Sequence, residues 1–385
     1  MPDKTIHVSR KPERVKHGWV FSNEVRRGEG EPKTGDSVKV FDRGRFIGSG
    51  LYNANSLISV RLYSEEDEEL GRELIASRLK AAYEYRTSLL PHESDFRLCY
   101  GESDRLPGLV IDKYERQFAV QAYSAGMDQR LGVVTSVLEQ DFGTECVYEK
   151  NDFRLRDIEG LARKTGVLAG TPKPRVEIAE AGAKFTVDVK SGQKTGFYFD
   201  QRLTRQKVRE LAKGRKVLDV FSYSGGFAVN AALGGAGHVL AVDSSAPACE
   251  LARANAALNG VAERCEVITA DAFEFLSGAK PGFDLICLDP PSFAKSARER
   301  MRGLRGFAKL NALAMRLLSG NGILVTCSCS HHLSWQDLAQ VLARAAADAG
   351  RDFVILDRLT QGPDHPALLA MPETEYLRCF VLLVR

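Results

Sequence analysis

Cys329, which has a serine on each side, follows an apolar run near the end of the chain. Residues 322–327 predict a strand, and a thiol at the carboxyl end of a strand is well placed to act as a nucleophile. Carbon-5 of cytosine is a poor nucleophile, but thiolate addition to carbon-6 makes the ring enamine-like, and carbon-5 can then attack an electrophile. Cys327 lies two residues earlier and faces the same side of an extended strand, so alternation leaves both thiols as candidates.

Two other interpretations of these cysteines stay open. Thiols at a strand end can be buried and inert. A zinc site would add His331 and His332, but Cys-x-Cys followed at once by His-His lacks the usual spacing of zinc ligands. The sequence therefore favours a nucleophile over a metal ligand, and it predicts no metal.

The segment Asp289-Pro290-Pro291 follows another predicted strand, at residues 283–288. Two prolines fix φ and remove amide donors, so the chain leaves the sheet at a set angle. Such a loop can hold a flat base, with the Asp289 carboxylate forming hydrogen bonds to the base edge. The alternative is a double proline that only terminates the strand.

A glycine pair, Gly225 and Gly226, follows Ser222 just after the predicted strand at residues 216–221. Paired glycines allow a ligand to approach the backbone and leave amides free at a helix start. The spacing G-x-G-x-x-G is absent, which counts against a dinucleotide. The pattern instead favours a nucleoside cofactor without phosphates.

Aspartates mark the ends of four successive predicted strands. Asp219 could face an ammonium group, Asp243 lies at the spacing that reaches ribose hydroxyls, and Asp271 could bind an adenine amino group. S-adenosylmethionine carries all three groups, and Asp289 would complete its site. A turn or helix-cap role is the alternative for each aspartate taken alone.

Basic residues gather after the double proline, where six cations oppose only Glu299. Lys295, Arg298, Arg302 and Arg305 are the candidates for contacts with phosphates on either side of a target nucleotide. The N-terminal segment through Tyr63 is also basic, with 12 basic and 7 acidic residues. Both features are compatible with a polyanion such as RNA, and the alternative for each is a solvated basic face with no partner.

Length and composition limit the class of protein. The 385 residues suggest two or three domains, and 44% hydrophobic with 27% charged residues is ordinary for a folded protein. No apolar run has the roughly 18 residues that a membrane span needs, and the polar start does not resemble a signal peptide. We therefore expect a cytoplasmic protein whose eight cysteines are reduced thiols.

Three patterns of elements follow one another along the chain. Short alternating strands predict a small β-barrel domain over residues 1–70, and mixed helices and strands predict an α+β domain over residues 71–178. From residue 179 to 385, apolar strands alternate with helices, which predicts an α/β doubly wound parallel sheet. The last two strands, at residues 353–356 and 376–384, predict an antiparallel hairpin at one edge of that sheet.

The motifs together resemble the RlmI-type 23S ribosomal RNA cytosine-C5 methyltransferases. The resemblance rests on residues 194–202 (KTGFYFDQR), the glycine loop, the double-proline loop, Ser328-Cys329-Ser330, and the segments at residues 17–22 and 101–108. It implies an N-terminal PUA RNA-binding domain, a middle α+β domain and a Rossmann-like domain that binds S-adenosylmethionine. It also favours Cys329 over Cys327 as the nucleophile.

The chain departs from this family at His331-His332, where family members have a small or apolar pair. The family itself lacks the second, Pro-Cys cysteine of other RNA cytosine-C5 methyltransferases, and Ser292 after the double proline fits that absence. The group that removes the carbon-5 proton and releases the product is therefore not assigned.

The prediction that follows is methyl transfer from S-adenosylmethionine to carbon-5 of a cytosine in 23S ribosomal RNA, through a bond between Cys329 and carbon-6. One alternative is methylation of a base nitrogen, because Asp-Pro-Pro-Ser-Phe partly resembles the loop of amino methyltransferases. Another is a non-catalytic RNA-binding or ribosome-assembly protein. The target nucleotide stays open, and a homodimer is compatible with the sequence.

Overall fold

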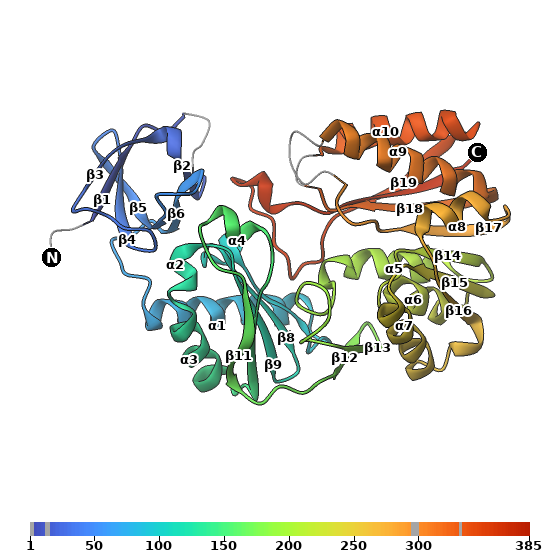
Figure 1. Cartoon of the computed structure of the whole chain (residues 1–385), viewed down its shortest axis with the longest axis horizontal. Helices are drawn as coiled ribbons and strands as arrows, with labels where there is room; N and C mark the ends of the chain where they lie inside the picture. The colour runs from blue at the N-terminus through green and yellow to red at the C-terminus, as the bar shows by residue number, and fades with distance from the viewer. Residues whose placement is uncertain (1–3, 12–15, 294–299, 331–332) are drawn as a thin grey trace. The chain divides into compact units, whose positions relative to one another are not determined.

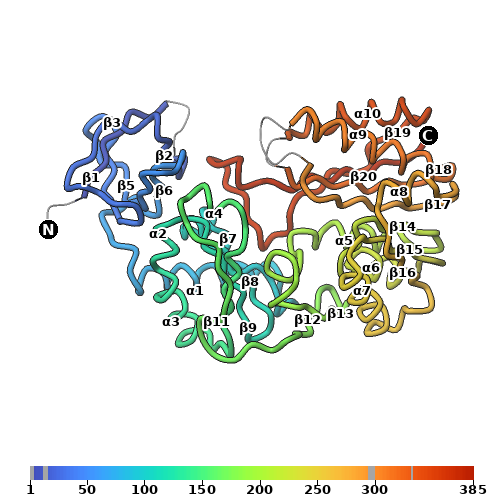
Figure 2. The backbone as a smooth tube through the Cα atoms, in the orientation of Figure 1, coloured from blue at the N-terminus to red at the C-terminus, as the bar shows by residue number. Residues whose placement is uncertain are grey.

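The protein is described by a computed structural model, which covers residues 4–11, 16–293, 300–330 and 333–385 (Figure 1). The chain forms two compact units. The first comprises Met1–Ile178, Val187–Phe199 and Pro363–Thr374, and the second comprises Ala179–Thr186, Asp200–Gly362 and Glu375–Arg385. The backbone trace in Figure 2 shows that the chain passes more than once between the two units.

The first unit begins with a six-stranded sheet in the order β2-β6-β5-β4-β1-β3. Its strands are β1 (Thr5–Val8), β2 (Trp19–Phe21), β3 (Val25–Glu29), β4 (Ser37–Asp42), β5 (Arg45–Tyr52) and β6 (Ile58–Ser64). Alternating valines of β4, with Ile6 and Val60, form its core. The short strands predicted in this segment are present, and the sheet matches the expected PUA-like fold.

A second sheet in this unit has five strands in the order β11-β10-β9-β8-β7. Its strands are β7 (Phe96–Tyr100), β8 (Leu109–Tyr114), β9 (Gln117–Ala122), β10 (Cys146–Asn151) and β11 (Lys164–Gly170), and its helices are α1 (Arg72–Leu89), α2 (Ala125–Asp128), α3 (Leu131–Phe142) and α4 (Leu155–Ile158). Ile75 and Leu79 of α1, with Val134 and Leu138 of α3, belong to one buried core. The domain boundary at residue 70 stays a prediction, since both sheets belong to one compact unit.

The second unit contains a seven-stranded sheet in the order β16-β15-β14-β17-β18-β20-β19. Its strands are β14 (Lys216–Val220), β15 (His238–Asp243), β16 (Cys265–Thr269), β17 (Phe283–Leu288), β18 (Leu318–Ser328), β19 (Phe353–Leu359) and β20 (Arg378–Val384). The first five strands are parallel, and β20 runs antiparallel between β18 and β19. The predicted doubly wound sheet with an antiparallel edge hairpin is confirmed.

Helices cover both faces of this sheet because its central strands are apolar on both sides. Its helices are α5 (Arg202–Leu211), α6 (Gly226–Leu233), α7 (Ala246–Leu258), α8 (Ala272–Gly278), α9 (Arg300–Leu317) and α10 (Trp335–Ala349). Figure 1 shows α8, α9 and α10 on one face and α5, α6 and α7 on the other. Leu218, Ile286 and Leu324 pack with Leu310 and Leu342 in the core beneath α9 and α10.

A separate two-stranded sheet pairs β12 (Val176–Glu180) with β13 (Ala183–Val187), where the chain passes between the units. No helix of the described residues is both long and apolar enough to span a membrane.

Candidate functional site

The strand order of the large sheet reverses at β14, which lies between β15 and β17. Ligands of open α/β sheets bind beyond the carboxyl ends of the strands at such a point. The register pairs Val220 of β14 with Leu288 of β17, and Leu288 with Thr326 of β18. The glycine loop, the double-proline loop and the segment Ser328-Cys329-Ser330, which begins with the last residue of β18, therefore lie along one edge of the sheet.

The glycine loop between β14 and α6 has a strained backbone. Phe221, Tyr223 and Gly225 have φ angles of 66°, 48° and 81°. Left-handed φ angles at non-glycine residues are uncommon and persist only where the surroundings hold them. Here the amides of Phe221 and Ser222 donate to the carbonyl of Val242, at 2.9 and 3.1 Å. The loop is thus held against β15 in one conformation, as a ligand-binding loop requires.

Gly225 cannot be replaced by a larger residue without strain. Its φ is 81°, and a Cβ built on it would lie 3.2 Å from the Cβ of Ala252. We expect Gly225→Ala to lower the free energy of unfolding by roughly 1–3 kcal/mol and to weaken S-adenosylmethionine binding. Thermal denaturation and calorimetric titration of the variant would measure both effects.

Gly278→Ala is the matched control for this substitution. Gly278 ends α8, has no left-handed φ, and has open space around the built Cβ. The stability of this variant should stay within about 1 kcal/mol of the parent protein. If Gly225→Ala and Gly278→Ala changed the free energy of unfolding and the cofactor affinity by the same amounts, the proposed role of the strained loop would be contradicted.

Asp219 lies inside β14 and is fully buried. One carboxylate oxygen accepts hydrogen bonds from the Ser222 hydroxyl at 2.6 Å and the Ala228 amide at 3.0 Å. The other oxygen, Oδ1, is buried and has no hydrogen-bond partner among the described residues. Burial is the main cause that raises the pKa of Asp219 to about 7, with Asp289 and Asp243 contributing, while the two hydrogen bonds oppose the rise. A cationic ligand group beside Oδ1 would stabilise the ionised carboxylate and so lower the pKa of Asp219 again.

The other aspartates lie at the same edge in different roles. Asp243 ends β15, and its two oxygens accept from the amides of Tyr223 and Ser245, both at 2.9 Å. Asp271 is exposed and caps α8 by accepting from the amides of Phe273 and Glu274. The expectation that Asp219 and Asp271 end their strands is inexact, because β14 continues to Val220 and β16 stops at Thr269. The cap role of Asp271 leaves its proposed adenine contact a prediction.

The double-proline loop and the end of β18 share a small hollow of about 10 Å³. It is lined from one side by Pro290, Pro291 and Phe293 and from the other by Ser328 and Ser330. A space of that size holds about one water molecule, so the hollow alone is too small for a base. It does bring the loop next to the residues that flank Cys329.

The two candidate cysteines differ in accessibility. Cys327 is 1% exposed, faces Cys379 across the antiparallel strand pair, and contacts the Gln201 side chain at 3.9 Å. Burial, and then the Cys379 thiol, raises the pKa of the Cys327 thiol well above its usual value. Cys329 lies just beyond the last residue of β18 and is partly exposed. Of these two cysteines, Cys329 is therefore the one with surface exposed to solvent.

The basic candidates are only partly described. Lys295 and Arg298 lie outside the described residues, as do His331 and His332 of the zinc alternative. Arg302 and Arg305 are exposed on α9. Among the residues that the structure covers, no group of three histidine, cysteine or acidic side chains could hold a metal ion.

The sequence pattern around Asp200 predicts no role for its individual residues beyond their place in the motif at residues 194–202. Asp200 and Gln201 are buried, and the Tyr376 hydroxyl donates to Asp200 at 2.5 Å. Arg205 pairs with Glu180 through two hydrogen bonds of 2.5 and 2.7 Å. These partners are distant in sequence, so only the motif itself could have indicated that the segment matters.

Comparison with known proteins gives two family matches. A model described as S-adenosylmethionine-dependent methyltransferase matches residues 156–374, and a PUA-like domain model matches residues 10–65.

Curated relatives match almost the whole chain. A ribosomal RNA large subunit methyltransferase I from Aeromonas salmonicida is 40% identical over 381 residues, and one from Vibrio cholerae is 38% identical, each covering 96% of both chains. Among solved structures, a methyltransferase complexed with SAH (SMU.776) has a TM-score of 0.85 at 21% identity and covers 100% of both chains. A methyltransferase structure from Streptococcus mutans has a TM-score of 0.84 at 21% identity and covers 99% of this chain and 100% of that one. At 21% identity, the similarity to these two solved structures is evidence for the fold of the chain.

Proposed function

The chain belongs to the family of S-adenosylmethionine-dependent methyltransferases that includes the ribosomal RNA large subunit methyltransferases I, and from this premise we propose that it methylates carbon-5 of a cytosine in 23S ribosomal RNA. The nucleophile in this proposal is Cys329. The single observation that supports it is that Cys329, just beyond β18, is partly exposed and lies between Ser328 and Ser330, which share a hollow with the double-proline loop, while Cys327 is buried.

The residues at the edge of the sheet fit the cofactor. S-adenosylmethionine supplies a methyl group on a sulfonium, together with an ammonium group, a ribose diol and an adenine. The unpartnered Oδ1 of Asp219 suits the ammonium, and Asp243 suits the ribose hydroxyls. Ser222 holds Asp219 in place, while Gly225 permits the close backbone approach. Asp271 and Asp289 complete the set of residues that we propose to bind the cofactor.

The thiolate of Cys329 would form a bond to carbon-6 of cytosine. Addition would move the electron pair of the 5,6 double bond onto carbon-5, which would take the methyl group that the cofactor supplies, with the neutral thioether S-adenosylhomocysteine as the leaving group. Transfer of the carbon-5 proton to a base, which is not assigned to a residue, and loss of the thiolate from carbon-6 would restore the aromatic ring and the free enzyme. Asp289, at the rigid start of the double-proline loop, would hold the base edge by hydrogen bonding.

RNA carrying 5-fluorocytosine tests the reaction class and the nucleophile together. Fluorine at carbon-5 cannot leave as a proton does, so the adduct between the thiol and carbon-6 should persist in the presence of S-adenosylmethionine. We expect a covalent protein–RNA complex on a denaturing gel, with the modification mapped to the peptide that contains Cys329.

Mass spectrometry of the methylated nucleoside from unmodified RNA provides the control. 5-Methylcytidine is the expected product. A methyl group on a base nitrogen, formed without any thiol adduct, would favour the other reaction class and contradict this proposal.

A further inference from the structure

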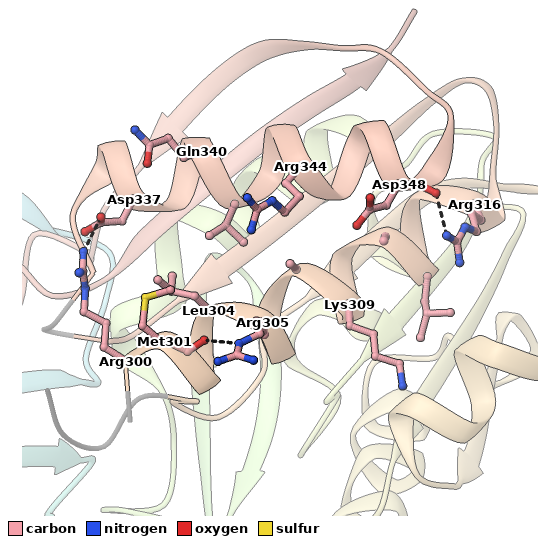
Figure 3. Close-up of a pocket in the computed structure, with 14 residues that line it drawn as sticks. Arg300, Met301, Leu304, Arg305, Lys309, Arg316, Asp337, Gln340, Arg344 and Asp348 are labelled. Carbon is pink, nitrogen blue, oxygen red and sulfur yellow. Dashed lines mark hydrogen bonds and ion pairs between the residues drawn. The ribbon is translucent and has the colours of Figure 1, made fainter. Parts of the chain in front are cut away.

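A groove of about 700 Å³ runs between α9 and α10 in the second unit (Figure 3). Arg305 and Lys309 come from α9, and Arg344 comes from α10. Apolar side chains, including Leu304 and Val341, lie between these charged residues. The groove is therefore lined by both apolar and charged side chains, and its cations Arg305, Lys309 and Arg344 are exposed.

The cations of the groove outnumber its acids, and several have no acidic partner within the described part of the chain. Arg300 pairs with Asp337 at 2.5 Å at one end, and Arg316 donates to the carbonyl of Asp348 at 2.7 Å at the other. Among the described residues, Lys309 and Arg344 form no ion pair, and both are exposed. Uncompensated charges on two facing helices create a positive potential between them.

The groove begins at the edge of the sheet that holds the candidate site. Because α9 follows β17 and α10 follows β18, both helices start at the carboxyl ends of parallel strands. Arg300 is the first residue of α9, and Asp337 lies in the first turn of α10, so their pair marks this end. The 18 residues of α9 then extend about 27 Å away from the site.

We propose that the α9–α10 groove binds the phosphate backbone of the RNA segment next to the target nucleotide. This proposal rests on the proposed function and adds a binding path for its substrate. Arg305, Lys309 and Arg316 are spaced four and seven residues apart on a helix, so they project from one side over about 16 Å. A row of cations with that extent matches a polyanion with regularly repeated charges.

An acidic protein segment is a poorer fit than RNA. The row of cations extends directly from the edge where the base must be held, as a continuous nucleic-acid strand requires. Contacts to phosphate position a substrate without reading its sequence, which suits exposed cationic side chains such as Lys309 and Arg344.

The test replaces the two unpaired cations in the full chain, as Lys309→Gln with Arg344→Gln. We expect the affinity for an unmodified 23S transcript to fall roughly tenfold, with the slope of log K against log salt reduced by about 1.4. The KM for RNA should rise by a similar factor, while the affinity for S-adenosylmethionine stays unchanged. Filter binding over a salt series and steady-state kinetics measure these quantities.

The control removes two exposed cations elsewhere in the same unit, as Lys213→Gln with Lys280→Gln. Each precedes a parallel strand, β14 or β17, and so lies at the opposite edge of the sheet. If the groove variant and the control bind RNA with the same affinity and salt slope, the groove proposal is wrong. If the unaltered protein binds the transcript but transfers no methyl group, the proposed function fails instead, and the binding comparison still decides the groove.

Discussion

Replacing Cys329 with alanine is expected to lower methyl transfer to RNA by roughly 10³-fold or more, because the route through carbon-6 depends on this sulfur. The affinity for S-adenosylmethionine should not change, since its proposed contacts come from the carboxyl ends of β14, β15, β16 and β17 and the loops that follow them. Radiolabelled methyl transfer and calorimetric titration of the cofactor would measure the two effects separately. The residue is partly exposed at a strand end, so the variant should fold.

Cys327→Ala is the matched control, two residues away on the same strand. Its thiol is 1% exposed and packs beside Cys379, so its loss removes a buried contact and should lower stability by about 1 kcal/mol. Methyl transfer should continue. Full turnover by the Cys329 variant, or loss of turnover in the Cys327 variant alone, would overturn the assignment of the nucleophile.

Asp219→Asn should weaken S-adenosylmethionine binding by roughly ten- to a hundredfold, because a hydrogen bond to a charged group contributes about 1.5–3 kcal/mol and the amide group that replaces Oδ1 cannot accept a hydrogen bond from the ammonium. The asparagine oxygen can still accept from Ser222 and Ala228, which hold this side chain in place. The loss of cofactor affinity therefore measures the effect of the charge and not a change in the conformation of the loop. Calorimetric titration at pH 8 gives the affinity.

The same substitution should stabilise the protein without cofactor at alkaline pH. The folded protein holds the Asp219 proton up to a pKa of about 7, against 3.8 in the unfolded chain. The folded state thus binds more protons between these values, and its stability falls as the pH rises from about 4 to 7. The shift corresponds to roughly 4 kcal/mol, which Asp219→Asn should largely recover at pH 8 but not at pH 4. Denaturant unfolding at both pH values measures this.

Asp284→Asn provides a control of opposite sign. Hydrogen bonds from the Lys216 amide and the Ser319 hydroxyl lower the pKa of Asp284, so its contribution to stability is present above pH 3.8 and is lost as the pH falls through the lowered value. Its removal should slightly destabilise the protein at pH 8 and leave cofactor affinity unchanged. If the two substitutions changed the free energy of unfolding in the same way at each pH, the conclusion that ionised Asp219 destabilises the folded protein would be refuted.

The fold was largely predictable because its signals are local. Apolar runs bounded by turn residues predicted the strands β14 to β18, and β16 and β17 match the predicted residues. Elements with weaker patterns were missed, such as β1 and β11. β11 is an edge strand whose residues are mostly half-exposed or exposed, so it carries little apolar signal.

The sequence by itself determined the fold class, the loop that needs Gly225 and the two cysteines that could act on a base. Only the tertiary structure separated Cys327 from Cys329, because their exposure depends on β20 and on Gln201, which lie far away in the chain. It likewise decided the pKa of Asp219 and the groove between α9 and α10. Burial and electrostatic potential arise from the packing of residues that are remote in sequence, and no local pattern encodes them.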